Sequence, residues 1–184
     1  YVDAKKSLFS GNKKKICIIS IDDEYCQKIY QELKTRSNVK AIPISIKNKP
    51  EGGYFVKKDI LYDNTGDTPV EIMNLEGLER LRGDHNAQNI MACYAAAKAL
   101  KVAPSKIISA IESFEGLAHR QELVDEIDGV QYINDSKATN ADATEKALSC
   151  FDEIYLILGG LPKEDGILSL LPYLPKIKRV FLIG

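Results

Sequence analysis

A continuous apolar run at residues 15–21 constrains the fold more than any other feature of the chain. It ends in Asp22-Asp23-Glu24, and the segment that follows keeps its apolar residues at helical spacing as far as Leu33. A short β-branched run without polar alternation is typical of a strand buried on both faces of a parallel sheet. A strand that leads directly into a helix predicts an α/β fold.

The remaining segments continue this alternation of strands and helices. We predict strands at 41–46, 123–127, 130–133 and 154–158 and a last one ending at 183, a small antiparallel meander over 52–75, and helices at 83–100, 104–111, 142–148 and 167–171. Asp128-Gly129 is a strong hairpin signal, and Asp142 and Glu145 have the spacing of a helix N-cap. The alternation indicates right-handed βαβ crossovers and a parallel sheet, with a domain boundary near residues 116–120.

The composition describes a globular chain of 184 residues, 45% of them hydrophobic, with a net charge of -1 and a pI near 6.2. This charge gives no global attraction to nucleic acid or to an anionic membrane. No apolar run reaches membrane-spanning length, and the first residues lack a signal-peptide core. We therefore expect neither membrane insertion nor a nucleic-acid partner. A start at Tyr1 and an end at Gly184, directly after a strand-like run, suggest a piece of a longer chain.

The four cysteines, Cys17, Cys26, Cys93 and Cys150, lack the paired spacing of a metal site. They stand in apolar or helical contexts. We expect reduced, buried thiols, which indicate a cytoplasmic protein.

Asp22 and Asp23 allow two interpretations. They could ligate a metal ion, but carboxylates at a helix start are also favoured by capping and by the helix dipole. We favour the capping interpretation.

The segment Asn134-Asp-Ser-Lys-Ala-Thr-Asn140 concentrates polar groups at the exit of a predicted strand. Open α/β sheets bind ligands at this edge, where an acidic residue such as Asp135 commonly accepts ribose hydroxyls. The segment could instead be a turn with good capping chemistry. Lys137 adds nothing to a turn and loses side-chain entropy when ordered, so we favour a ligand-binding loop.

Three further signals are weaker. Asn86 and Asn89 share a helix face, and their amides match the N6 and N7 edge of adenine; capping and surface exposure are the alternative. Arg120 could clamp phosphate oxygens or form a surface ion pair. Gly159-Gly160 would let backbone N–H groups approach an anion near Lys163, although a strand-to-helix turn also favours glycine. The chain has neither a P-loop sequence nor a dinucleotide-binding glycine fingerprint.

Taken in order, four motifs resemble the Mur ligases of bacterial cell-wall synthesis, and among them the D-glutamate-adding branch. The motifs are Gly83-x-His-Asn-x-x-Asn89, Phe114-x-Gly-Leu-x-His-Arg-x-Glu122, Asn134-Asp-Ser-Lys-Ala-Thr-Asn140 and Gly159-Gly-x-x-Lys163. The resemblance implies that residues 1–116 are the back part of a P-loop-type central ATPase domain, a parallel sheet with a small antiparallel sheet. It implies that residues 117–184 are the first half of a Rossmann-like C-terminal domain.

The resemblance also implies a reaction. ATP, with Mg²⁺, would phosphorylate the carboxylate of UDP-N-acetylmuramoyl-L-alanine, and the amine of D-glutamate would then attack the acyl phosphate to form an amide bond for peptidoglycan. The intact protein would be a cytoplasmic monomer. Because the upstream P-loop and other parts of such an enzyme are absent, we expect this chain alone to be inactive. The alternative is a non-catalytic nucleotide-binding or scaffold module.

By the same resemblance, Asn86 and Asn89 would contact the adenine, Arg120 the phosphates and Asp135 the ribose. On the substrate side, Lys137 and Thr139 would face the phosphate and the substrate, with Asn140 beside them. Lys163 would bind the D-glutamate carboxylate.

Lys5 resembles the family lysine that is carbamylated. As a carbamate it would be an anionic Mg²⁺ ligand and, with Lys137, part of the catalytic set. Leu161-Pro162 departs from the smaller, more polar pair that often precedes the lysine at 163, which leaves the reach of Lys163 open.

Overall fold

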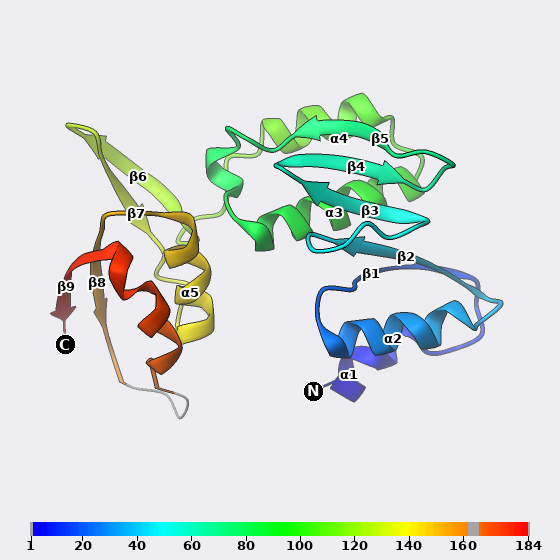
Figure 1. Cartoon of the computed structure of the whole chain (residues 1–184), viewed down its shortest axis with the longest axis horizontal. Helices are drawn as coiled ribbons and strands as arrows, with labels where there is room; N and C mark the ends of the chain where they lie inside the picture. Colours follow the sequence, from blue (N-terminus) through cyan, green and yellow to red (C-terminus); the bar gives the residue numbers. More distant parts are fainter. Residues whose placement is uncertain (1, 162–165, 184) are drawn as a thin grey trace. The chain divides into compact units, whose positions relative to one another are not determined.

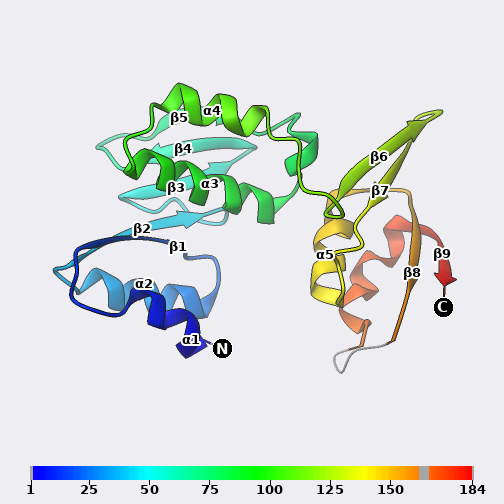
Figure 2. The same cartoon turned by 180° about the vertical axis from the view of Figure 1, so that it is seen from behind.

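The computed structural model describes residues 2–161 and 166–183 and divides the chain into two compact units. The first unit comprises Tyr1–Glu79 and Asp84–Ser113, and the second comprises Arg80–Gly83 and Phe114–Gly184. Each unit is described by itself below. Figures 1 and 2 show the elements of both from opposite sides.

Among its described residues, the first unit contains five strands, four α-helices and one complete 3-10 helix. In chain order they are α1 (Val2–Lys6), η1 (Ser7–Phe9), β1 (Lys15–Ser20), α2 (Glu24–Lys34), β2 (Val39–Ser45), β3 (Gly53–Lys57), β4 (Ile60–Asn64), β5 (Val70–Asn74), α3 (Asp84–Ala99) and α4 (Pro104–Glu112). A short 3-10 helix, η2 (Glu79–Leu81), precedes α3 and is divided between the units, with Glu79 in the first and Arg80 and Leu81 in the second.

The strands form one mixed sheet in the order β1-β2-β3-β4-β5. β1, β2 and β3 are parallel, and β3, β4 and β5 form an antiparallel meander. The mixed sheet confirms the predicted parallel sheet with its antiparallel extension. Gly53 is required where β3 enters the sheet, because a Cβ there would lie 2.0 Å from the carbonyl oxygen of Pro43 in β2.

Helices cover both faces of the β1 end of this sheet (Figure 1). Cys17 and Ile19 of β1 pack with Ile29 and Leu33 of α2. Ser20 points to the opposite face because side chains alternate along a strand, and there Gln88 of α3 contacts it. Only alternate residues of β1 are fully buried, and Ile16 remains 48% exposed. The prediction of burial on both faces was therefore wrong for this strand.

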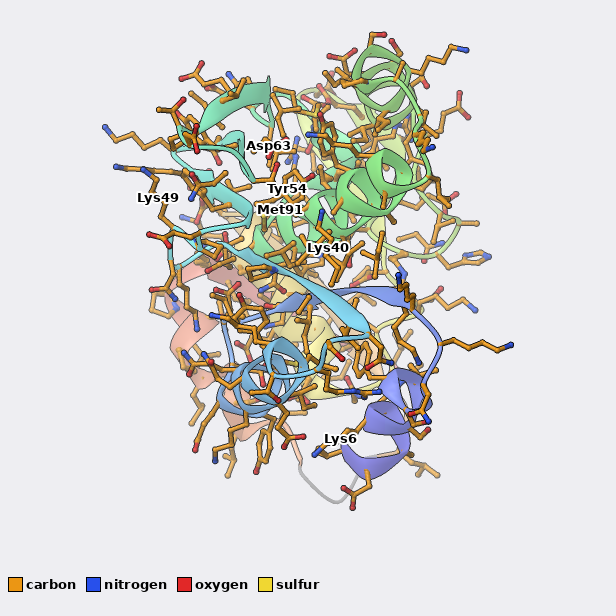
Figure 3. The ribbon with its side chains drawn as sticks, turned by 90° about the vertical axis from the view of Figure 1, so that its right-hand side faces the viewer. Lys6, Lys40, Lys49, Tyr54, Asp63 and Met91 are labelled. Carbon is orange, nitrogen blue, oxygen red and sulfur yellow. The ribbon has the colours of Figure 1, made fainter. Side chains whose placement is uncertain are left out.

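The meander packs on α3 through a core that contains one ion pair. Leu61 of β4 and Met91 of α3 are fully buried, and Tyr54 and Tyr94 meet edge to face at 5.7 Å. Asp63 and Lys98 form a salt bridge at the margin of this core. Figure 3 shows Asp63, Tyr54 and Met91 close together between the meander and α3.

The second unit contains two small sheets. Its elements are β6 (Glu122–Ile127), β7 (Val130–Asn134), α5 (Ala141–Cys150), β8 (Ile154–Gly159), η3 (Leu168–Lys176) and β9 (Ile177–Ile183). β6 and β7 are antiparallel, whereas β8 and β9 are parallel. Asp128 and Gly129 both have positive φ, 51° and 77°, as the two-residue hairpin turn requires, so the predicted hairpin is confirmed.

One local prediction in this unit was confirmed in position but not in length, and another was wrong. The predicted helix at 167–171 is a 3-10 helix, η3, that runs on to Lys176 and contains Pro172 and Pro175; proline lacks the N–H that an α-helix interior needs. The N-cap of α5 is Asn140, whose side chain accepts from the backbone N–H of Ala143 at 2.9 Å. Asp142 and Glu145 instead lie inside the helix.

The four cysteines are free thiols, but they are not all buried. Cys17 is buried, Cys26 and Cys150 are partly buried, and Cys93 on α3 is exposed, so the expectation of four buried thiols was wrong. Burial, together with the neighbouring Asp23 carboxylate, raises the pKa of the Cys26 thiol to about 11.

Within the described part of the chain, no helix has both the length and the apolar character needed to cross a membrane.

Candidate nucleotide and substrate site

Residues 117–121 form a tight turn with an uncommon backbone. Leu117 and Arg120 make an isolated antiparallel bridge, and the N–H of Arg120 donates to the carbonyl of Leu117 at 3.2 Å. His119 and Gln121 both have positive φ, 65° and 44°. Residues other than glycine adopt this conformation at a cost, and they keep it when surrounding contacts hold them there.

Those contacts come mainly from the Asn134–Asn140 segment. The carbonyl of His119 accepts from the N–H of Lys137 at 3.0 Å, and the N–H of Gln121 donates to Oδ1 of Asp135 at 3.0 Å. On the other side, the N–H of His119 donates to Oε2 of Glu122 at 2.7 Å. Two motifs that are separate in sequence therefore form one structure.

Asn134 fixes the orientation of the His119 ring. Its Oδ1 accepts from the N–H of Ser136 at 3.1 Å, so the other end of the amide must be the donor. That Nδ2 lies 2.9 Å from Nδ1 of His119 and 3.3 Å from Oε2 of Glu122. Nδ1 then acts as an acceptor, which leaves the proton of the neutral imidazole on Nε2. The 3.8 Å separation between His119 Nδ1 and Glu122 is the longer contact, and we assign the ring from the Asn134 bond.

The rest of the loop presents polar side chains to solvent. The N–H of Ala138 donates to the carbonyl of Asp135 at 2.8 Å, and that of Thr139 to the carbonyl of Lys137 at 3.0 Å. Lys137, Thr139 and Asn140 are exposed, whereas Asp135 is partly buried. The cap occupies Oδ1 of Asn140, so any contact of this side chain with a substrate falls to its Nδ2.

Arg120 lies beside this loop in the second unit, with an exposed side chain at the end of the 117–121 turn. The structure thus brings together Arg120, Asp135, Lys137, Thr139 and Asn140. They offer one guanidinium, one ammonium, one carboxylate and neutral hydrogen-bonding groups. This combination suits a phosphate-bearing ligand that also carries hydroxyl groups.

Asn86 and Asn89 belong to the first unit. α3 begins at Asp84, so Asn86 lies inside the first turn and capping does not account for it. Nδ2 of Asn89 donates to Oδ1 of Asn86 at 3.3 Å, which confirms that the two amides share a face. Asn89 is exposed and Asn86 is partly buried.

The acidic pair after β1 divides into two roles. Asp23 caps α2 by accepting from the N–H of Cys26 at 2.9 Å, which confirms the capping interpretation for this residue. Asp22 does not cap the helix; its carboxylate accepts from the N–H groups of Ile46 and Lys47 at 3.0 and 3.3 Å. Among residues 2–161 and 166–183, no group of three His, Cys, Asp or Glu side chains is placed to hold a metal ion.

Lys5 and Lys163 are the two remaining predicted site residues. Lys5 is exposed on the short helix α1. Lys163 lies outside the described residues. Gly160, which precedes it, has a φ of 103°, a conformation that glycine adopts without steric cost.

In a comparison with protein families, residues 1–97 match the Mur ligase middle domain. The chain belongs to the Mur ligase family. It is 43% identical over 185 aligned residues to the UDP-N-acetylmuramoylalanine–D-glutamate ligase of Rhodospirillum rubrum and 42% identical to that of a Chelativorans species. Both alignments cover 100% of this chain and 39% of the relative. The chain thus spans about two fifths of the length of these Mur ligases.

Solved Mur ligases share the fold at low sequence identity. MurF from Acinetobacter baumannii superposes with a TM-score of 0.59 at 16% identity, covering 91% of this chain and 42% of that one. MurC from Thermotoga maritima gives a TM-score of 0.55 at 14% identity, covering 96% and 46%. These likenesses confirm the predicted fold class.

Sequence reasoning missed several residues that build the site. Glu122 was part of a quoted motif but received no role, and it holds the His119 backbone and the Asn134 amide. Gln121 was not singled out, because its contribution is a backbone N–H. Gln88 lies between Asn86 and Asn89 in the sequence, and its Nε2 donates to Oδ2 of Asp22 at 2.6 Å. The only local signal was the polar character of Gln88 on an alanine-rich helix.

Proposed function

We propose that the full-length protein is an ATP-dependent ligase that joins D-glutamate to UDP-N-acetylmuramoyl-L-alanine through an acyl-phosphate intermediate, a step of peptidoglycan synthesis. The observation that carries this proposal is the match, at 42–43% identity over the whole of this chain and 39% of each relative, to ligases named for that reaction. The Asn134–Asn140 loop supports it, since the loop is held in one shape by the 117–121 turn. We further propose that the full-length protein is a cytoplasmic monomer. In it, residues 1–116 would be the back part of the middle domain and residues 117–184 the first half of the C-terminal domain.

The side chains divide between the nucleotide and the reacting end. Asn86 and Asn89 offer paired amides to the adenine edge, Asp135 accepts from the ribose, and Arg120 clamps phosphate oxygens. An acyl phosphate concentrates negative charge on the group that leaves when the amine attacks. Lys137, whose side chain is exposed on the loop, is proposed to stabilise that charge, because positioned cations lower the barrier to phosphoryl and acyl transfer.

Thr139 and Asn140 can then orient the substrate through their hydroxyl and amide groups, which neutral side chains do without adding charge. Lys163 is proposed to pair with the D-glutamate carboxylate. The role of Lys163 is supported by the family resemblance alone. The roles of Thr139 and Asn140 are supported by the resemblance and by their exposed position on the loop.

Mg²⁺ would supply neutralisation of the ATP phosphates when bound. The donor set of the described residues fits it through Lys5 only if this lysine is a carbamate, since an ammonium offers no oxygen ligand whereas carboxylate-type oxygens are what Mg²⁺ prefers. Lys5 is exposed on α1, so carbon dioxide can reach its amine.

Phosphate release by the full-length protein tests the proposal. We expect release from ATP only when UDP-N-acetylmuramoyl-L-alanine and D-glutamate are both present. Lys137→Ala and Lys163→Ala should suppress it, whereas Lys146→Ala, an exposed lysine on α5, should not. Equal release with L-glutamate or D-alanine would overturn the substrate assignment. ATP binding without any release would favour a non-catalytic nucleotide-binding module.

A further inference from the structure

Asp22 joins the ends of two parallel strands in the first unit. It follows β1, and its carboxylate accepts from the N–H groups of Ile46 and Lys47, just beyond β2, and from the hydroxyl of Ser45. Ser45 is fully buried, and its Oγ in turn accepts from Lys47 and Asn48 at 3.1 and 2.8 Å. The carboxylate is therefore held in one orientation.

The same carboxylate also holds α3. Nε2 of Gln88 donates to Oδ2 of Asp22 at 2.6 Å and lies 3.3 Å from Oγ of Ser20. Hydrogen bonds from Ser45, Ile46, Gln88 and Lys47 outweigh the effect of burial and lower the pKa of Asp22. The bond from Gln88 is therefore charge-assisted at neutral pH, and such bonds are about twice as strong as neutral ones.

Gln88 stands between the two asparagines but faces another way. Each residue of an α-helix turns the side chain by about 100°, so Gln88 is turned about 200° from Asn86 and 100° from Asn89. Gln88 is directed at the sheet, whereas the Asn86–Asn89 pair lies on another face and leaves Asn89 exposed.

The neighbours of Gln88 explain why this one bond matters. Ala87, Ile90 and Met91 of α3 are buried apolar residues. Apolar contacts are not directional, and small side chains such as alanine interlock little. A directional, charge-assisted bond in the second turn can set the rotation and the height of the helix start.

We propose that Asp22, acting through Gln88, is a positioning residue for the nucleotide site, because it fixes the face of α3 that carries Asn86 and Asn89. This inference rests on the proposed function, which assigns those two amides to the adenine. In this proposal Asp22 and Gln88 do not contact the nucleotide themselves; they act by holding α3, and with it the two amides, in place.

Gln88→Met is the main test, since methionine keeps the length of the side chain and lacks the donor. We expect the Kd of the full-length protein for ATP, measured by calorimetry, to rise about tenfold, the effect of one charge-assisted hydrogen bond. In phosphate release, the KM for ATP should rise by the same factor while kcat and the KM for D-glutamate stay within about twofold. Asp22→Asn should change the ATP affinity in the same direction. Gln27→Met, at an exposed position on α2, is the matched control.

A double-variant comparison separates positioning from general damage. If Gln88 acts through the two asparagines, Gln88→Met should weaken ATP binding no further in a protein that already carries Asn86→Ala and Asn89→Ala. An equal loss in that background, or an unchanged Kd in Gln88→Met alone, would overturn the proposal. So would unchanged ATP affinity in the Asn86→Ala/Asn89→Ala protein itself.

A different result would refute the proposed function without refuting this inference. Wild-type protein that binds ATP but forms no amide with D-glutamate would refute the ligase reaction. The calorimetric comparison of the variants would still decide whether Asp22 and Gln88 position the adenine-binding amides.

Discussion

The backbone N–H of Gln121 donates to Oδ1 of Asp135 at 3.0 Å, so the carboxylate that we propose for the ribose also supports the 117–121 turn. The bond helps to hold Gln121 at a positive φ of 44° and fixes the orientation of the carboxylate. Asp135 is thus proposed to have two roles, one in the structure of the turn and one in binding, and substitutions can separate them.

Asp135→Asn should weaken ATP binding while the loop remains folded. Asparagine keeps an oxygen that can accept from Gln121 but loses the charge and one acceptor. We expect the KM for ATP to rise about tenfold, as for loss of a charge-assisted hydrogen bond, with an unchanged melting temperature. Asp135→Ala should raise the KM and also lower the melting temperature. An unchanged KM in both variants would leave Asp135 with only its structural duty.

Asn134 determines which nitrogen of His119 carries the proton. Nitrogen-15 NMR of the neutral ring should show the Nε2–H tautomer in the wild type, since Nδ1 accepts from Asn134. Asn134→Asp replaces the donor with an acceptor, so we expect Nδ1 to become protonated. The new carboxylate also approaches Glu122, and like charges at this separation destabilise the turn. An unaltered spectrum in the variant would show that another group sets the tautomer.

The Asp63–Lys98 pair should make the stability of the first unit depend on pH. Burial tends to raise the pKa of Asp63, but hydrogen bonds from Lys98 and Thr65 outweigh it and lower the pKa below its usual 3.8. A carboxylate with a lowered folded-state pKa stabilises the fold above its unfolded pKa and loses that effect as pH falls through the folded value. Lys98 has a raised pKa, chiefly because it bonds to Asp63, so its contribution is lost as pH rises through that value, above 10.5.

Asp63→Asn should therefore cost about 1–2 kcal/mol of unfolding free energy at pH 7 in urea titrations. This lies in the lower part of the range for charged hydrogen bonds, because the Lys98 side chain is 39% exposed. The difference from wild type should shrink toward pH 3. Asp67→Asn, at an exposed carboxylate between β4 and β5, is the control. A difference that persists undiminished at pH 3 would contradict the ionic origin.

Asn140 can be tested for its two duties by one pair of substitutions. Asn140→Ala removes the cap of α5 and should cost about 1 kcal/mol of stability. Asn140→Asp keeps the cap and places a negative charge where the helix dipole favours it, so stability should not fall. If Nδ2 contacts a carboxylate-bearing substrate, the Asp variant should nevertheless raise the KM for D-glutamate about tenfold. Wild-type kinetics in the Asp variant would restrict Asn140 to capping.

The regular elements were predictable because they depend on local periodicity. The β1–α2 unit, the meander and the Asp128-Gly129 hairpin all follow from spacing and turn chemistry. The cap of α5 was not predictable in the same way. Asn140 and Asp142 are both good capping residues, and only the backbone path chooses between them.

Long-range contacts of the site were harder still. Asp22 is held by residues 23–66 positions further along the chain, and no local pattern marks those partners. The order of the polar motifs, by contrast, was visible in the sequence. It predicted which loops belong to the proposed site, although not how the 117–121 turn and the Asn134–Asn140 loop hold each other.

Cys93 offers a direct test of where the nucleotide lies on α3. It is exposed and stands four residues after Asn89, so it is about 6 Å further along the same helix face. Bound ATP should slow the alkylation of Cys93 by iodoacetamide in the full-length protein. The rate at Cys150, in the other unit, should change less, and Asn86→Ala/Asn89→Ala should abolish the protection of Cys93. Mass spectrometry of time points gives both rates in one experiment. Unprotected Cys93 at saturating ATP would place the adenine away from this face and remove the support for the roles of Asn86 and Asn89.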